Sequence, residues 1–276
     1  MKNLGGLGGT NNSHGNAIND SGYVTGVSAT SGEEMHAFLY DGTTMKDLGA
    51  IGGIMSEGTA INASGQVAGK SDINGIFTEH AFLYEGIKMK DLGTLGGKSS
   101  QSCGINASGQ IAGNSVMTDK EVRHAFLFSG GAMKDLGTLG GKDSRAYGLN
   151  ASGQVTGWSN TGDGGTHAFL YSGKGMIDLG TLGGSSCGNG VNASGQVVGE
   201  SYLPDRKTKH IFLYDDGTMY DLTNLIVPVS GSTDIRLSPG AGNPINDRGQ
   251  IVGQGTFREL PGMHGDPHAI LLTPKL

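Results

Sequence analysis

Short apolar runs separated by small and polar turn residues recur along the whole chain, as in residues 59–92. There, the runs 59–62 (TAIN) and 66–69 (QVAG) flank the turn 63–65 (ASG), and the runs 80–84 (HAFLY) and 89–92 (MKDL) follow. Short runs bounded by such residues predict strands, and glycine supplies the positive φ that tight hairpin turns require. The pattern therefore predicts a unit of four antiparallel strands.

This four-strand unit repeats six times. Segments related to MKDLG begin at residues 1, 45, 89, 133, 176 and 219, and segments related to HAFLY begin at residues 36, 80, 124, 167, 210 and 268. Self-similarity at a fixed period of this length indicates a repeat architecture. We therefore expect one domain over residues 1–276, made of six copies that begin near these MKDLG segments.

The layout of the repeat predicts an all-β, six-bladed β-propeller of four-stranded antiparallel blades. It resembles the layout of the propeller repeat that ends in Gly-His and Trp-Asp. By that resemblance the Ala-Ile-Asn strand is innermost and the Met-Lys-Asp-Leu strand outermost. The alternative places HAFLY innermost. The sixth copy has no fourth strand after HAILL, and residues 1–5 (MKNLG) resemble a fourth strand. We expect this N-terminal strand to close the propeller, since closure removes open sheet edges, and an open solenoid is the alternative.

The HAFLY, DLGTLGG and NASGQVVG segments resemble those of the HAF-repeat family of bacterial proteins, often described as extracellular repeats. The chain's ending, with residues 221–225 (DLTNL) and 245–253 (INDRGQIVG), also resembles that family, so the resemblance covers essentially the whole chain. It implies a secreted or cell-surface setting. It implies no catalytic residues, because the family carries no assigned activity.

Composition narrows the classes of function. The formal net charge is −6 and no basic run is present, which argues against nucleic-acid binding. No stretch of 18 apolar residues appears, so no membrane span is expected, and the N-terminus lacks the apolar core of a leader. The protein is therefore expected to be cytoplasmic or to begin after a removed leader. Cys103 and Cys187 fall in non-adjacent repeats and are expected to be free thiols. We expect a monomer without cofactor or metal.

Two recurring motifs are expected to be structural. The HAF histidines occur once per repeat, too far apart to share one metal, and each is expected to bond an aspartate of its own blade. These aspartates are Asp47, Asp91, Asp135, Asp178 and Asp221, with Asn3 in the closing blade. The Asn-Ala-Ser tripeptides match a glycosylation pattern, but Asn and Ser are also turn formers, so we expect them to build the hairpin turn.

The positions at which the repeat varies are the candidate site. Five residues before the strand-ending asparagine stand His14, Glu57, Gln101, Arg145, Cys187 and Ala241, and three residues before it stand Asn16, Thr59, Cys103, Tyr147, Asn189 and Asn243. Trp158 and Tyr202 are expected in loops after the second strand, where they could be aromatic platforms. Polar side chains gathered at one opening of a fixed scaffold indicate a binding site, although they could also simply solvate a channel.

The leading functional hypothesis is therefore binding of a polar small molecule or glycan at the mouth of the central channel. The alternative is an enzyme of lyase, isomerase or hydrolase type, with His14 and Glu57 as acid–base pair and Arg145 as anion clamp. A protein-interaction scaffold is the third possibility.

One irregular segment is expected beside this opening. The connection over residues 223–243 is longer than its counterparts and contains the apolar run 225–229 (LIVPV). It could form a lid over the site or a surface flap where the propeller closes.

Overall fold

A computed structural model describes residues 1–74, 78–118, 122–225, 238–239, 244–256 and 267–274. The chain forms two compact units, Met1–Leu136 and Gly137–Leu276. A single domain over residues 1–276 stays a prediction. The apolar run of the expected lid, from residue 226 on, and the candidate residues Ala241 and Asn243 lie outside the described residues.

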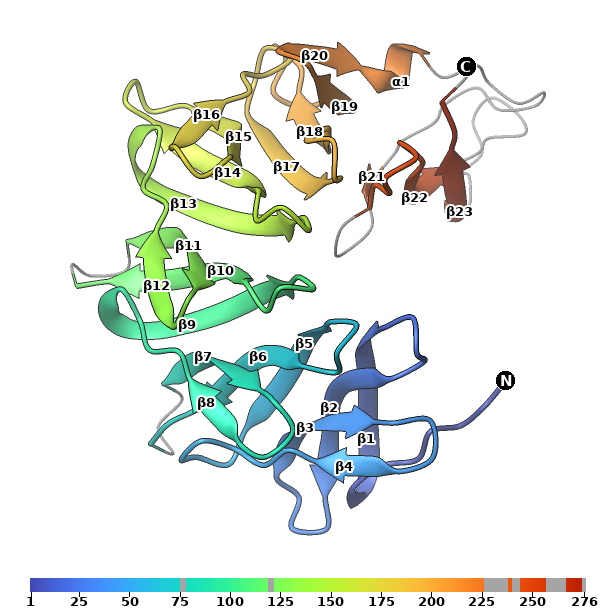
Figure 1. Cartoon of the computed structure of the whole chain (residues 1–276). Coiled ribbons are helices and arrows are strands. Elements are labelled where there is room, and N and C mark those ends of the chain that lie inside the picture. Colours follow the sequence, from blue (N-terminus) through green and yellow to red (C-terminus); the bar gives the residue numbers. More distant parts are fainter. Residues whose placement is uncertain (75–77, 119–121, 226–237, 240–243, 257–266, 275–276) are drawn as a thin grey trace. The chain divides into compact units, whose positions relative to one another are not determined.

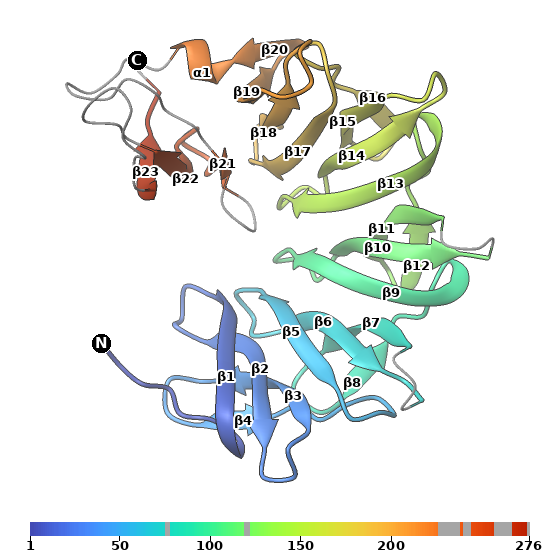
Figure 2. The ribbon, with the colours of Figure 1, turned by 180° about the vertical axis from the view of Figure 1, so that it is seen from behind.

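The first unit contains three four-stranded antiparallel sheets, in each of which strands adjacent in sequence pair (Figure 1). The sheets comprise β1 (Gly8–Ile18), β2 (Val24–Thr30), β3 (Met35–Tyr40) and β4 (Met45–Asp47); β5 (Ser56–Ile61), β6 (Val67–Asp72), β7 (Glu79–Tyr84) and β8 (Met89–Asp91); and β9 (Gly96–Ile105), β10 (Ile111–Met117), β11 (Arg123–Ser129) and β12 (Ala132–Asp135). Figures 1 and 2 both show the second sheet between the first and the third.

The second unit repeats this plan. Its sheets comprise β13 (Gly140–Leu149), β14 (Val155–Thr161), β15 (Thr166–Tyr171) and β16 (Met176–Asp178); β17 (Ser186–Val191), β18 (Val197–Tyr202), β19 (Lys209–Asp215) and β20 (Thr218–Asp221); and the three described strands β21 (Ser238–Pro239), β22 (Ile251–Thr256) and β23 (Pro267–Leu272). The helix α1 (Leu222–Leu225) follows β20, and no helix among the described residues is long and apolar enough to cross a membrane.

The strand order within the sheets agrees with the predicted order. The Ala-Ile-Asn strand forms one edge of each four-stranded sheet and the Met-Lys-Asp strand forms the other. The alternative that places HAFLY innermost is wrong, because this strand lies between two partners in each of the five four-stranded sheets. In the first unit the edge strands β1, β5 and β9 contact one another in turn, and in the second unit β13 contacts β17.

The hydrophobic core lies between neighbouring sheets. Ala37 of the first sheet packs with Val67, Phe82 and Tyr84 of the second, and all four are buried. The glycine of the second strand makes room for the aromatic residue: a Cβ on Gly69 would lie 2.0 Å from the carbonyl oxygen of Glu57 and 2.5 Å from the ring of Phe82. Because apolar residues lie on both faces of a sheet, its central strands appear in the sequence as short apolar runs.

Buried serine hydroxyls join neighbouring sheets in both units. Ser56 Oγ accepts a hydrogen bond from the backbone of Ala37 at 2.8 Å and donates one to the carbonyl of Gly49 at 2.5 Å. Ser100 and Ser186 make the equivalent pairs of bonds. A hydroxyl is needed here because both backbone groups would otherwise be buried without partners.

The recurring histidines bond the aspartates of their own sheets, as predicted. In each of the five four-stranded sheets the histidine Nδ1 lies within 2.7–2.9 Å of an aspartate carboxylate oxygen. The pairs are His36 with Asp47, His80 with Asp91, His124 with Asp135, His167 with Asp178, and His210 with Asp221. Each pair ties the third strand to the end of the fourth.

The Asn-Ala-Ser turns are structural as well. Asn62 is 5% exposed, and its amide donates to Gln66 Oε1 at 2.6 Å and to the carbonyl of Asn106 in the next sheet at 3.1 Å. Asn150 donates to the carbonyl of Asn192 in the same way, at 2.8 Å. Because the amide nitrogens are buried and bonded, they are poor acceptors for a glycan.

The N-terminal segment contacts the first sheet as an outer strand contacts the sheet that follows it. Lys2 Nζ donates to the carbonyl of Gly42 at 2.8 Å. Lys46, the equivalent residue of β4, donates to the carbonyl of Gly86 at 3.2 Å. Residues 1–6 have no strand pairing among the described residues, and so closure by residues 1–5 stays a prediction.

Candidate functional site

The strand register extends the candidate site beyond the first strands. In the five four-stranded sheets, the residue five positions before the strand-ending asparagine lies directly opposite a second-strand residue that also varies between repeats: Val27, Lys70, Asn114, Trp158 and Glu200. The residue before each HAF histidine varies too: Met35, Glu79, Arg123, Thr166 and Lys209. We call these positions, with the two varying first-strand positions, the variable face of each sheet.

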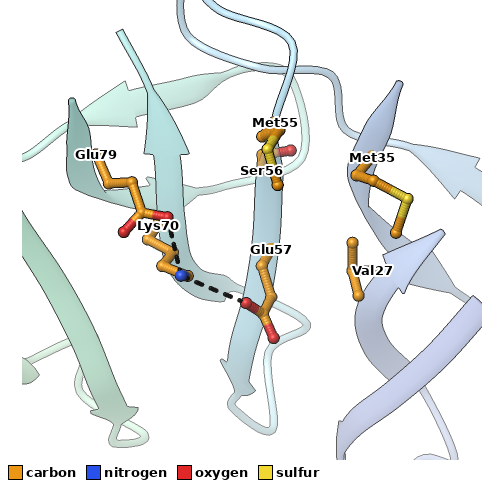
Figure 3. A pocket seen from close by; sticks show the side chains of 7 residues that line it. All are labelled: Val27, Met35, Met55, Ser56, Glu57, Lys70 and Glu79. Atoms are coloured by element: carbon orange, nitrogen blue, oxygen red, sulfur yellow. Dashed lines mark hydrogen bonds and ion pairs between the residues drawn. The ribbon is translucent and has the colours of Figure 1, made fainter. Parts of the chain in front are cut away.

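In the second sheet the variable face carries a charged cluster (Figure 3). Lys70 Nζ lies 2.8 Å from a carboxylate oxygen of Glu79 and 3.8 Å from one of Glu57. The other oxygen of Glu57 accepts a hydrogen bond of 2.9 Å from the amide of Asn16, on β1 of the first sheet. Two of the residues predicted from the sequence, Asn16 and Glu57, are therefore brought together.

The charges of this cluster are coupled. Partial burial alone would lower the pKa of Lys70, but the hydrogen bond and charge of Glu79, together with the charge of Glu57, outweigh it, and the pKa is raised. Asp72, opposite Glu79 in the register and only 2% exposed, has its pKa raised by burial and then by the charge of Glu79. Three carboxylates around one ammonium group leave an excess of negative charge.

A cavity of about 160 Å³ adjoins the cluster. Figure 3 shows Glu57 near its middle, with Lys70 and Glu79 on one side and Val27 and Met35 of the first sheet on the other. Met55 and Ser56 complete the lining. Ser56 is occupied by its bonds to the backbone, so the groups available to a ligand are the charged side chains and an apolar wall.

In the fifth sheet the same positions carry the reversed charges. Glu200 stands where the second sheet has Lys70, and its carboxylate lies 2.9 Å from Lys209 Nζ. That ammonium group also lies 5.1 Å from the centre of the Tyr202 ring. Tyr202 is the last residue of β18 and was wrongly expected in a loop, because the second strand extends to the residue opposite Lys209.

The fourth sheet carries an aromatic and cationic cluster. The guanidinium carbon of Arg145 lies 5.7 Å from the centre of the Trp158 ring, and Trp158 Nε1 donates to the hydroxyl of Tyr147 at 3.3 Å. Trp158 lies within β14, directly opposite Arg145, and so the prediction that places it in a loop is also wrong. The loop boundary was misjudged because the strand continues past its apolar residues.

The remaining candidates are placed as follows. His14 is exposed on β1, and its side chain makes no hydrogen bond or ion pair with the described residues. Thr59 Oγ1 lies 2.9 Å from the hydroxyl of Ser102, so it links two sheets. Gln101 is partly exposed on β9. Asn189 on β17 has a buried side-chain oxygen without a hydrogen-bond partner in the part of the chain that the structure describes.

The two cysteines are free thiols that do not resemble nucleophiles. Burial raises the pKa of both Cys103 and Cys187 to about 12, and for Cys187 the charge of Glu200 adds to this effect. A thiol needs its thiolate form to attack or to bind metal. Within the described ranges no three His, Cys, Asp or Glu side chains gather as a metal site.

The structure does not test the acid–base hypothesis. Glu57 has Asn16 and Lys70 as partners rather than His14, and Arg145 belongs to the second unit. The roles of His14, Glu57 and Arg145 in catalysis therefore stay predictions.

Comparison with known proteins supports the fold. No family model and no curated protein matches the chain. The β-propeller domain of the Trilobed protease from Pyrococcus furiosus, described as having an open velcro topology, is similar over 93% of this chain and 79% of its own, with 9% identity and a TM-score of 0.53.

Two further solved structures are more distant. TolB from Acinetobacter baumannii matches 72% of this chain with 14% identity and a TM-score of 0.45, and this chain spans 50% of its length. The six-bladed lectin from Aleuria aurantia covers 93% of both chains with 13% identity and a TM-score of 0.38. Together with the sheet order, the likeness to the protease domain confirms an all-β propeller built of four-stranded antiparallel sheets.

Proposed function

We propose that the protein is a binding protein whose variable faces hold a small polar molecule. The cavity beside Glu57 is the observation that carries this proposal. Its charged side, with Lys70 and Glu79, opposes an apolar wall of Val27, Met35 and Met55. A lining that is apolar with a few charged groups is typical of small-molecule sites.

The size and charge of the cavity define the ligand class. About 160 Å³ suits a molecule of the size of one amino acid or one monosaccharide. The excess of carboxylates favours a ligand with an amino group or with several hydroxyl donors. The apolar wall favours a ligand that also has a hydrocarbon face, and both an apolar amino acid and a sugar meet this condition.

The contrast between constant and variable positions supports binding over a purely structural role. The serine, histidine and asparagine contacts recur from sheet to sheet, and they hold the backbone together. The variable face is not needed for those contacts. Glu57 nevertheless carries a carboxylate that is partly buried and held by two neighbours, which positions it for a ligand.

Binding can be tested with a defined panel. Thermal unfolding would be measured with L-leucine, L-lysine, D-glucose and L-fucose, and positive compounds would be titrated by calorimetry. Glu57→Gln removes a charge-assisted hydrogen bond and should weaken binding by roughly tenfold or more. The matched control is Glu200→Gln, which removes a lysine-bound carboxylate from the variable face of the fifth sheet and should leave this affinity unchanged.

The binding assay distinguishes the proposal from its alternatives. Saturable binding of one compound that only Glu57→Gln weakens supports the proposal. Absence of binding by the whole panel at millimolar concentration, or equal losses in both variants, refutes it.

We also propose a family and a cellular location for the protein. Membership of the HAF-repeat family and a secreted or cell-surface location rest on the recurring HAFLY and NASGQ segments. Fractionation of the native host, with detection of the protein in the medium or at the surface, would test the location.

A further inference from the structure

A second group on the variable faces has the opposite charge. Arg145 on β13 lies directly opposite Trp158 on β14, and Trp158 lies directly opposite Ala168 on β15. Tyr147 lies two residues after Arg145 on β13, its hydroxyl accepts a hydrogen bond from Trp158 Nε1, and the residue is 39% exposed. These side chains all belong to the fourth sheet, in the second unit, whereas the cavity residues belong to the first unit.

Arg145 differs from other cations of the variable faces in having no acidic partner. Lys70 is bonded to Glu79, and Lys209 is bonded to Glu200. The side chain of Arg145 makes no hydrogen bond or ion pair with the residues that the structure describes, and its Nε is buried without a partner. A partly buried cation without a counter-charge is costly, and a bound anion would remove that cost.

The neighbouring aromatic residues hold the guanidinium in place. Its carbon lies 5.7 Å from the centre of the Trp158 ring, within the range of a cation–π contact. The hydrogen bond of 3.3 Å from Trp158 Nε1 to the Tyr147 hydroxyl fixes the indole in turn. A guanidinium oriented in this way loses little conformational freedom when it forms two parallel bonds to a carboxylate.

We propose that Arg145, Trp158 and Tyr147 form a second binding site, which takes a carboxylate carried on a small ring. The guanidinium binds the carboxylate through its terminal nitrogens. The exposed ring of Tyr147 provides a flat face beside it for the ring of the ligand. Sugar acids and aromatic acids share this chemistry, and neutral sugars lack the group that Arg145 would recognise.

The site carries its own reporter, because Trp158 is the single tryptophan of the chain. Tryptophan fluorescence of the full-length protein would be titrated with D-glucuronate, benzoate, D-glucose and inorganic phosphate. We expect a saturable change with glucuronate or benzoate and none with glucose at the same concentration. The stronger of the two carboxylates identifies whether the ring is a sugar or an aromatic ring.

Variants separate the charge from the fold. Arg145→Gln should weaken carboxylate binding by about tenfold or more, and Arg145→Lys should recover only part of it, because an ammonium group does not make the paired bonds. Circular dichroism would verify that each variant is folded, and Tyr147→Phe, which removes only a hydroxyl, provides a milder change that should weaken binding less. Lys174→Gln, which removes a cation from an exposed turn between β15 and β16 of the same sheet, is the control variant and should leave this response unchanged.

Three results would overturn the proposal. These are the absence of a saturable change with either ring carboxylate, phosphate binding as tightly as the better of them, and unchanged affinity in folded Arg145→Gln.

Discussion

Replacing His80 with alanine should lower stability without acting on a binding site. His80 Nδ1 lies 2.9 and 3.0 Å from the two carboxylate oxygens of Asp91, and the two side chains are 15% and 40% exposed. A hydrogen bond to a charged group contributes about 1.5–3 kcal/mol, and the exposure of Asp91 screens part of it. Asp91 keeps its bond of 2.7 Å from the backbone of Gly93, so we expect a loss on the order of 1–2 kcal/mol.

The assay is urea unfolding followed by far-ultraviolet circular dichroism, together with thermal unfolding. A loss of 1 kcal/mol lowers the Tm by about 2–4 °C in a protein of this size class. His14→Ala is the matched control, because the side chain of His14 is exposed and makes no hydrogen bond or ion pair with the described residues, and it should change stability by less than about 0.5 kcal/mol. A double-mutant cycle with Asp91→Ala isolates the coupling between the two side chains.

Unchanged stability of His80→Ala with loss of ligand binding would refute the structural role of the histidine. A coupling energy near zero in the cycle would show that the bond to Asp91 contributes nothing.

Three other changes have expected outcomes. Deleting residues 1–5 removes the bond from Lys2 to Gly42, and should lower the Tm and increase aggregation; a deletion variant that melts like the full chain would contradict closure by this segment. Asp72→Asn should stabilise the protein at neutral pH, because the folded-state pKa of Asp72 is raised above 3.8 and its ionised form is therefore disfavoured in the fold. This gain in stability should disappear as the pH falls through the folded-state pKa of Asp72 to below 3.8, which denaturation curves across that range would measure. A gain that stays constant with pH would contradict the raised pKa. Cys103 and Cys187 should react with iodoacetamide near pH 8 far more slowly in the folded protein than in urea, because burial raises both thiol pKa values to about 12; equal rates by mass spectrometry would exclude this.

The fold was predictable because its signals are repeated. One HAFLY strand could be a buried segment of any kind, but six copies, of which the first five begin 43 or 44 residues apart, define the sheet, its hairpins and its strand order. The bond between His80 and Asp91 was predictable for the same reason, since the two residues recur together.

The candidate site beside Glu57 was less predictable, because the strand register cannot be derived from the sequence alone. Lys70 and Glu79 were missed, although each varies between repeats, because only the pairing of β5, β6 and β7 shows that they lie beside Glu57. Trp158 was placed in a loop because the end of a strand depends on backbone pairing and not on its apolar residues alone.

Because the recurring positions hold the sheets together and other positions form the variable face, the variable face of one sheet can change independently of the others. Many of the contacts that join neighbouring sheets use backbone groups or residues that recur in most copies, such as Ser100 and Asn62. A few substitutions in one sheet, arising by evolution or by design, can therefore change its binding surface. The binding surfaces of the neighbouring sheets would stay as they are. The charge reversal from Lys70 and Glu79 to Glu200 and Lys209 is an existing example of such an exchange on an unchanged backbone.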